Sequence, residues 1–220
     1  AAGLAAGVWT VVVSERAVDR LALDYATMRA GTIIALGIPT QALLGGVTVL
    51  TDLNPWVVAL HLLVSMAIIG VCVLLLDHLR GPDRPAAAPT LAKVAAAVFG
   101  VGWVVLYLGT VVTGSGPHAG DEKAPRIDLD PQVMSHVHAW AVYALVALTL
   151  LALWLAYRHG QPVVRRAALL LLGVELAQGG IGFWQYFTDL PELLVGLHML
   201  GAGLISAAVT WLVLSTRVRR

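Results

Sequence analysis

The chain has 220 residues, of which 59% are hydrophobic and 12% are charged, and its formal net charge is +1 at pH 7. Its mean hydropathy of +0.83 exceeds what a soluble core needs, so we expect an integral membrane protein. The nearly neutral charge argues against a nucleic-acid partner, and the single cysteine, Cys72, excludes an intrachain disulfide and a thiolate metal cluster.

Apolar runs predict seven helical segments, at residues 1–13, 30–50, 56–77, 91–113, 132–157, 167–187 and 192–214. Six of these segments are long enough to cross a hydrocarbon core ~30 Å thick, which takes about 20 helical residues. The first segment is too short and has no basic leader or cleavage site, so we interpret it as the second half of a helix that begins upstream. The expected fold is all-α: a polytopic transmembrane helix bundle in a chain truncated at its N-terminus.

The placement of basic residues predicts the orientation of this bundle. If every apolar segment crosses the membrane, twelve of the fourteen Lys and Arg residues fall on one side, and Lys123 and Arg126 fall on the other. The positive-inside rule makes the crowded side cytoplasmic, together with the C-terminus. The turns at 51–55 and 188–191 and the long loop at 114–131 are then expected to face outward.

Two stretches of the chain repeat the same outline: TDLNPWVVALH, which ends at His61, and TDLPELLVGLH, which ends at His198. A shift of 137 residues superposes 41–61 on 178–198 with eight identities in twenty-one positions, among them Gln41/Gln178, Gly45/Gly182 and the Thr-Asp-Leu triplet. Chance explains matched apolar residues in such a composition, but it explains matched polar residues poorly. We infer two homologous halves with the same orientation in the membrane.

The repeat also predicts a domain organisation. Residues 1–80 form an incomplete N-terminal half that contains a partial helix and the hairpin 30–77, residues 81–90 form a cytoplasmic linker, and residues 91–220 form a C-terminal four-helix half. The same shift places His138 opposite residue 1. We therefore expect an intact parent protein to have eight spans, four in each half.

Three histidines are expected at the same depth in the membrane. His61, His138 and His198 each follow, by six or seven residues, a proline that marks the start of a helix. At 1.5 Å per residue, each lies ~10 Å inside its helix from the outer end. Three imidazoles at one depth on three helices form what we call the histidine layer.

The chemistry of the histidine layer points to a haem. Polar groups at such depth are commonly functional, and a neutral imidazole is an axial ligand of haem iron that can be presented between bundle helices. No aspartate or glutamate accompanies the layer, which argues against a di-metal carboxylate centre. The alternative is that these are core histidines whose nitrogens are satisfied by hydrogen bonds between helices.

Four stretches of the chain resemble the successive signatures of the haem A synthase family: QALLGGVTVLTDLNPWVVALHLLVSM, YLGTVVTGSGPHAGDE, MSHVHAW and LPELLVGLHMLGA. The resemblance covers about residues 27–214 in the right order and spacing. It implies two four-helix halves and a reaction that oxidises the methyl group of haem O to the formyl group of haem A. A membrane b-type cytochrome that carries electrons, and a haem-binding or transport protein without catalysis, are the alternatives.

The resemblance also implies roles for individual histidines. His138 and His198 would be the axial ligands of a haem b in the C-terminal half, and His61 would bind the iron of the substrate haem in the N-terminal half. The family's second span carries a glutamate and a nearby ligand residue whose positions fall before residue 1 of this chain. The catalytic residue is therefore unknown, with His61 as the candidate at the substrate site.

Two interpretations are open for the role of each of the other polar residues. Gln41 and Gln178 could join helices, which we favour, or approach a porphyrin edge. Lys123 and Arg126 could pair with haem propionates or remain solvated loop charges. Glu175 is an acid near the middle of a span, and a functional role and a neutral, hydrogen-bonded role are equally open.

The expected partners follow from the resemblance. They are haem O as substrate, haem A as product, a haem b cofactor, an electron donor and a haem O synthase, and a homo-oligomer is also possible. We expect a multi-pass protein of the bacterial plasma membrane that supplies terminal oxidases.

Overall fold

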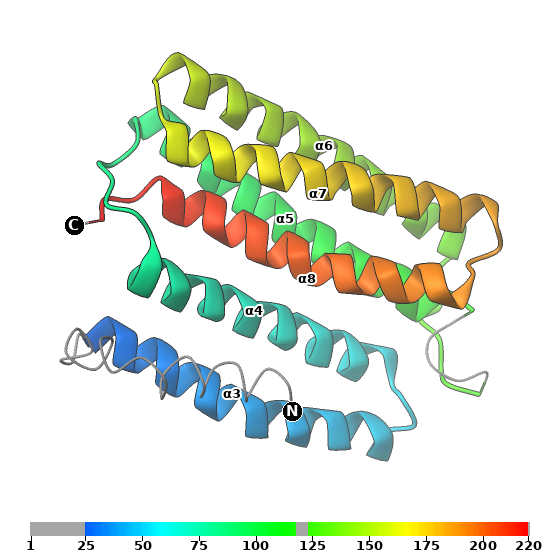
Figure 1. Cartoon of the computed structure of the whole chain (residues 1–220). Coiled ribbons are helices and arrows are strands. Elements are labelled where there is room, and N and C mark those ends of the chain that lie inside the picture. The colour runs from blue at the N-terminus through cyan, green and yellow to red at the C-terminus, as the bar shows by residue number, and fades with distance from the viewer. Residues whose placement is uncertain (1–24, 118–122, 220) are drawn as a thin grey trace.

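The computed structural model describes residues 25–117 and 123–219, which form six helices and no β-strand (Figure 1). The helices are α3 (Tyr25–Leu50), α4 (Pro55–Arg80), α5 (Pro89–Ser115), α6 (Pro131–Arg158), α7 (Pro162–Phe187) and α8 (Glu192–Ser215). Each is long and apolar enough to cross a membrane, which confirms the expected all-α, polytopic bundle. The segment expected at residues 1–13 lies outside the described residues.

Prolines and short capping side chains define where the helices begin. The helices α4, α5, α6 and α7 each start on a proline, whose missing N–H would have had no partner in the first turn. Side-chain oxygens of Asn54 and Asp130 accept hydrogen bonds from the first N–H groups of α4 and α6. The helix α7 begins five residues before the predicted position 167, because Arg165 and Arg166 interrupt the apolar run without ending the helix.

The two hairpin turns of the predicted repeat have the same backbone conformation. Two successive residues in each turn have positive φ angles: Asp52 (51°) and Leu53 (58°), and Asp189 (56°) and Leu190 (56°). Leu53 and Leu190 each donate an N–H to the carbonyl group five residues earlier, at 2.8 and 3.1 Å. A positive φ angle is unfavourable for leucine, although aspartate tolerates it, so the recurrence of this conformation at matched positions supports two copies of one structural unit.

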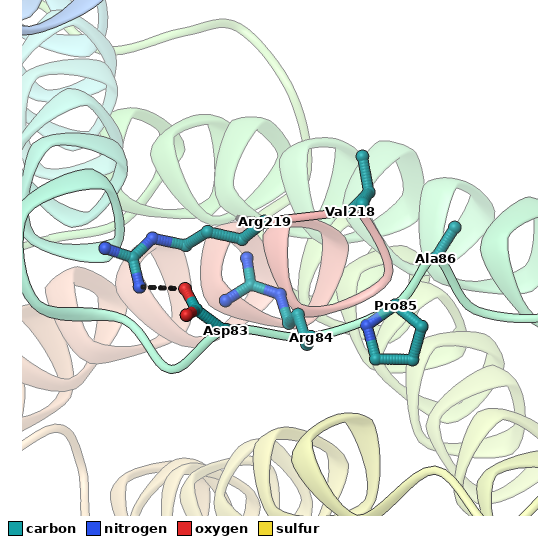
Figure 2. Close-up of a pocket in the computed structure, with 6 residues that line it drawn as sticks. All are labelled: Asp83, Arg84, Pro85, Ala86, Val218 and Arg219. Carbon is teal, nitrogen blue, oxygen red and sulfur yellow. Dashed lines mark ion pairs between the residues drawn. The ribbon is translucent and has the colours of Figure 1, made fainter.

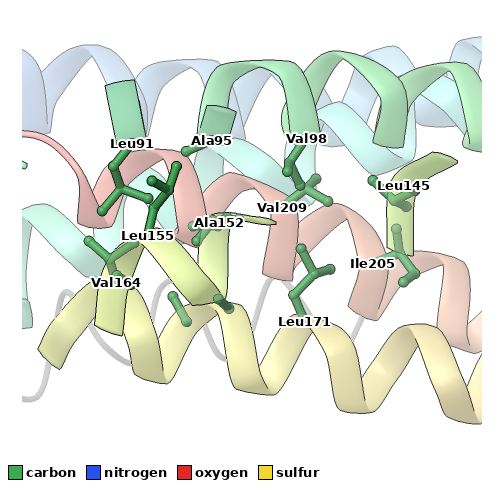
Figure 3. Packing of buried hydrophobic residues seen from close by; sticks show 14 of the residues in the cluster. Leu91, Ala95, Val98, Leu145, Ala152, Leu155, Val164, Leu171, Ile205 and Val209 are labelled. Carbon is green, nitrogen blue, oxygen red and sulfur yellow. The ribbon is translucent and has the colours of Figure 1, made fainter. Parts of the chain in front are cut away.

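Helices α5 to α8 form a closed four-helix arrangement around a buried apolar core. Each helix packs against its two neighbours in the cycle α5, α6, α7, α8, which places α6 and α8 at opposite corners (Figure 1). Figure 3 shows part of this core, which includes Leu91, Val98, Leu145, Leu155, Leu171 and Val209. His138 on α6 and His198 on α8 therefore stand on helices that are fixed by extensive side-chain packing.

The hairpin of α3 and α4 attaches to these four helices through α4, which packs against α8 and α5. At the α4–α8 contact, the buried hydroxyl of Ser206 donates a hydrogen bond to the carbonyl oxygen of Met66 at 2.7 Å. A Cβ on Gly70 would stand 3.1 Å from the hydroxyl oxygen of Thr210, so the backbone of α4 comes close to α8 there. Small residues and an interhelical hydrogen bond thus join the two predicted halves.

The linker after α4 is held by Arg84, whose side chain is 4% exposed. Its guanidinium donates to both carboxylate oxygens of Asp77, at 2.9 and 2.6 Å, and to the carbonyl oxygen of Leu214 at 2.8 Å. The backbone of Arg84 also pairs with that of Arg219. One buried side chain therefore ties the end of α4 to the end of α8.

Candidate functional site

The three histidines lie at one level of the bundle. His61 and His138 stand six and seven residues after the prolines that begin α4 and α6, and His198 stands six residues after Glu192, which begins α8. Each is therefore ~10 Å from the start of its helix. All three helices begin at the end of the bundle that carries the α3–α4 and α7–α8 turns, which we call the turn end (Figure 1).

Each histidine faces a glycine on the helix that precedes it in the chain. The imidazole Cε1 atoms lie 3.4 or 3.5 Å from the position that a Cβ would take on this glycine, in the pairs Gly45–His61, Gly109–His138 and Gly182–His198. A long side chain at any of these positions would fill the space of the ring. Gly45 and Gly182 stood out in the sequence as a matched pair, but Gly109 did not, because its repeat position would precede residue 1.

One ring nitrogen of each imidazole lacks a protein partner. The Nδ1 atoms of His61, His138 and His198 are buried and make no hydrogen bond within the part of the chain that the structure describes. A buried polar atom without a partner costs about 1–3 kcal/mol, so histidines that serve only to join helices are normally hydrogen-bonded. The unpaired Nδ1 atoms leave one nitrogen of each ring available to a ligand.

The arrangement of the three imidazoles suits a haem iron better than a bare ion. His138 and His198 come from α6 and α8, which stand at opposite corners of the four-helix arrangement. Among the described residues, no three His, Cys, Asp or Glu side chains form a group that could hold a metal ion. A haem iron takes one or two protein ligands because the porphyrin supplies the others, so this donor set fits a haem.

Gln41 and Gln178 occupy matched positions on α3 and α7 but make different contacts. The Nε2 atom of Gln41 donates to the main-chain carbonyl oxygen of His61 at 3.2 Å, and its Oε1 atom is buried with no partner among the described residues. The amide of Gln178 lies so close to Gly201 of α8 that a Cβ at this position would collide with it. Both glutamines therefore contact the following helix, and Gln41 contacts the main chain of His61 itself.

Lys123 and Arg126 lie in the loop between α5 and α6, at the turn end. Arg126 donates hydrogen bonds to the carbonyl oxygens of Ala124 and Pro117, at 2.8 and 3.0 Å, and so braces the loop. Lys123 is exposed. Both cations are thus at the same end of the bundle as the histidine layer, and residues 118–122 between α5 and Lys123 are outside the described range.

A pocket of about 680 Å³ lies at the opposite end of the bundle, where the linker after α4 meets the end of the chain (Figure 2). It is lined by Asp83, Arg84, Pro85, Ala86, Val218 and Arg219, and Asp83 and Arg219 form an ion pair at 3.9 Å. It contains none of the predicted site residues. We interpret it as a surface recess of the linker.

These features define a polytopic helical membrane protein with three half-buried imidazoles whose Nδ1 atoms are buried. Residues 1–127, more than half of the chain, match the COX15-CtaA family model, described as cytochrome oxidase assembly protein, so the chain belongs to this family. The family confirms the resemblance seen in the sequence and assigns the protein a role in cytochrome oxidase assembly. His61 lies within the matched region, whereas His138 and His198 lie beyond it.

Searches of curated proteins and of solved structures returned no match.

Proposed function

We propose that this protein is a haem A synthase-type oxidoreductase, which converts the methyl group of haem O to the formyl group of haem A. The family's role in cytochrome oxidase assembly supports a reaction that prepares an oxidase cofactor. The observation that carries the proposal is the layer of three imidazoles, each with a buried, unpaired Nδ1 atom and each facing a glycine. Such a layer provides ligands for more than one haem.

In this proposal His138 and His198 hold the iron of a haem b. A haem held by these two imidazoles would supply reversible electron transfer. The fold positions the two ligands. The helices α6 and α8 present the imidazoles of His138 and His198 from opposite corners, and Gly109 on α5 and Gly182 on α7 leave room for these rings.

His61 binds the iron of the substrate haem in the N-terminal half. Its helix, α4, packs against α8, which carries His198, so the two proposed haem sites are neighbours across one helix contact. Gln41 and Ser65 both donate to the main-chain carbonyl oxygen of His61, at 3.2 and 2.9 Å, and so restrain the backbone that carries the ligand.

The charged loop at the turn end supplies the proposed contacts with the haem propionates. Propionates face the wetter side of a membrane site, and Lys123 and Arg126 lie at the end of the bundle near the histidine layer. Gln178 would then line the porphyrin edge in addition to packing on Gly201. The proposed setting is a bacterial plasma membrane with the C-terminus in the cytoplasm, where a haem O synthase and an electron donor act as partners.

The test combines spectra with haem analysis of the full-length protein, expressed with a haem O source in a host that makes no haem A. We expect the wild type to show a haem b Soret band and to yield haem A by mass analysis. His138→Ala and His198→Ala should lose most of the Soret band, because each removes one axial ligand. His136→Ala is the matched control, since His136 is two residues from His138 and packs beside Tyr186 with ring centroids 6.0 Å apart.

His61→Ala distinguishes the synthase from its rivals. It should keep the haem b band and make no haem A, because it changes the substrate site alone. A wild type that binds haem b but leaves haem O unchanged would instead be a membrane electron carrier or a haem-binding protein. An unchanged Soret band in both His138→Ala and His198→Ala would disprove the proposed ligands.

A further inference from the structure

Glu175 is a buried acid in the middle of α7 that the proposed reaction does not use. It lies thirteen residues after Pro162 and twelve before Phe187, so both ends of the helix are ~18–20 Å away. The residue is 2% exposed. The hydroxyl of Thr149 on α6 donates to its Oε1 atom at 2.8 Å, while Oε2 is buried and has no partner among the described residues. Half of this carboxyl group is therefore left for a ligand.

Glu175 lines a cavity of about 390 Å³ between α6 and α7. The other lining residues are Val142, Tyr143, Val146, Ala147, Leu150, Leu176, Gly179, Gly180 and Phe183. A Cβ on Gly179 or Gly180 would have no atom within 4 Å, so the two glycines leave open space in the wall of the cavity. The cavity offers a ligand one hydrogen-bonding group in otherwise apolar or aromatic surroundings.

The cavity opens on the outer face of the bundle. Its rim residues Tyr143, Leu150, Leu176 and Phe183 are between 47% and 61% exposed, and α6 and α7 lie on the side away from the α3–α4 hairpin (Figure 1). In a membrane-spanning helix these exposed apolar side chains face lipid. A ligand would therefore enter from the bilayer and not from water.

The depth of Glu175 selects the kind of ligand. Acyl chains carry no hydrogen-bonding group, and phospholipid head groups stay at the interface, far from the middle of a ~30 Å hydrocarbon core. A molecule that reaches Glu175 must bring a small polar head into the hydrocarbon. Oε2 can accept a hydrogen bond from a hydroxyl group and, when the carboxyl is protonated, can donate one to a carbonyl oxygen.

We propose that the cavity between α6 and α7 binds a lipid-soluble molecule whose head is a ring with hydroxyl or carbonyl groups, the chemistry of a quinol and its quinone. The ring would lie between Tyr143 and Phe183, with one oxygen on Glu175 and the tail along the apolar rim. The proposal concerns binding, and no electron transfer is assigned to it. It is independent of the proposed haem chemistry.

The test measures equilibrium binding of 2-decylhydroquinone to the full-length, haem-loaded protein in phosphatidylcholine nanodiscs, with empty nanodiscs as the blank. The comparison probe is its dimethyl ether, which keeps the ring and tail but has no hydroxyl group. We expect saturable binding of about one hydroquinone per chain, with the ether at least about tenfold weaker because it cannot donate to Oε2. Infrared difference spectra should show the carboxyl band of Glu175 shifting on binding.

Three variants locate the site. Glu175→Leu should weaken hydroquinone binding about tenfold and remove the infrared shift, whereas Glu175→Gln, which keeps a donor and an acceptor, should stay within about threefold of the wild type. Gly179→Phe should abolish saturable binding by filling the cavity. The matched control is Gly173→Phe on the same helix, which is outside the cavity and should bind normally.

Several outcomes would overturn the proposal. Equal binding of the hydroquinone and its ether would show an apolar groove filled by lipid. Unchanged binding in both Glu175→Leu and Gly179→Phe would place the ligand elsewhere. Loss of haem from Gly179→Phe would assign the cavity to the haem site. If the wild type does not bind hydroquinone and Gly179→Phe changes the oligomeric state, this face is a contact between copies of the chain.

Discussion

The Cε1 atom of His198 lies 3.5 Å from the position that a Cβ would occupy on Gly182, and His61 has the same relationship to Gly45. The two pairs come from the two copies of the repeat, and Gly109 with His138 forms a third. The glycine therefore belongs to the histidine site as much as to helix packing, because it determines how far the ring can extend toward the preceding helix.

A leucine at position 182 should displace the imidazole of His198. Gly182→Ala should remain close to the wild type, since a Cβ at 3.5 Å makes ordinary van der Waals contact. Gly182→Leu adds atoms in the space of the ring at a cost of about 1–3 kcal/mol and should lower the haem bound per chain at least about twofold. Haem content is measured from the Soret absorbance, with Gly173→Leu on the same helix as control. Full haem binding by Gly182→Leu would contradict this role of the glycine.

A methyl group at position 201 should destabilise the protein through Gln178. The Cβ of Gly201→Ala would collide with the amide of Gln178, the far end of a flexible side chain that can turn aside, so we expect a loss of no more than about 1 kcal/mol in the free energy of unfolding. In a Gln178→Ala background the same change should cost much less. Gly196→Ala is the control on α8, because a Cβ there would have no atom within 4 Å. Equal losses in both backgrounds, measured by unfolding in detergent, would refute the contact.

The hydrogen bond from Ser206 to the carbonyl of Met66 should contribute measurably to the attachment of the α3–α4 hairpin. Ser206→Ala is expected to lower the free energy of unfolding by about 1 kcal/mol, the usual size of an interhelical hydrogen bond in a membrane protein. Ser215→Ala is the control, since its hydroxyl donates to Leu212 within its own helix. A larger loss for Ser215→Ala than for Ser206→Ala would go against this assignment.

Removal of Arg84 should destabilise the protein far more than removal of an exposed arginine. Arg84→Ala leaves the carboxylate of Asp77, which is 9% exposed, without its partner, and we expect a loss of about 3–5 kcal/mol. Arg84→Lys should restore little, because an ammonium group cannot match both carboxylate oxygens.

Two controls accompany the Arg84 variants. Arg158→Ala, which removes an exposed arginine over the ring of Trp154, should cost less than about 1 kcal/mol. The double variant with Asp77→Ala should cost less than the sum of its single variants, because the two side chains bond to each other. Strict additivity in thermal unfolding would mean that the pair is not coupled.

Much of this fold was predictable because a spanning helix must be apolar over about 20 residues and must satisfy its own backbone hydrogen bonds. The six described helices appear where the apolar runs predicted them. The largest errors are at the starts of α3 and α7, which each begin five residues before the predicted position, and in α7 these residues include Arg165 and Arg166. The depth of the histidines was predictable too, because prolines mark the helix starts and the rise per residue is constant.

The sequence alone determined the membrane class and the six spans, and it predicted the repeat and the three histidines at one depth. The contacts of Gly109 with His138 and of Thr149 with Glu175 were decided by the tertiary structure. The physical reason is rotational: these helices are apolar on every side, so their pattern does not specify which side faces a neighbour. Packing alone sets the rotation of each helix about its axis, and this rotation determines which side chains meet.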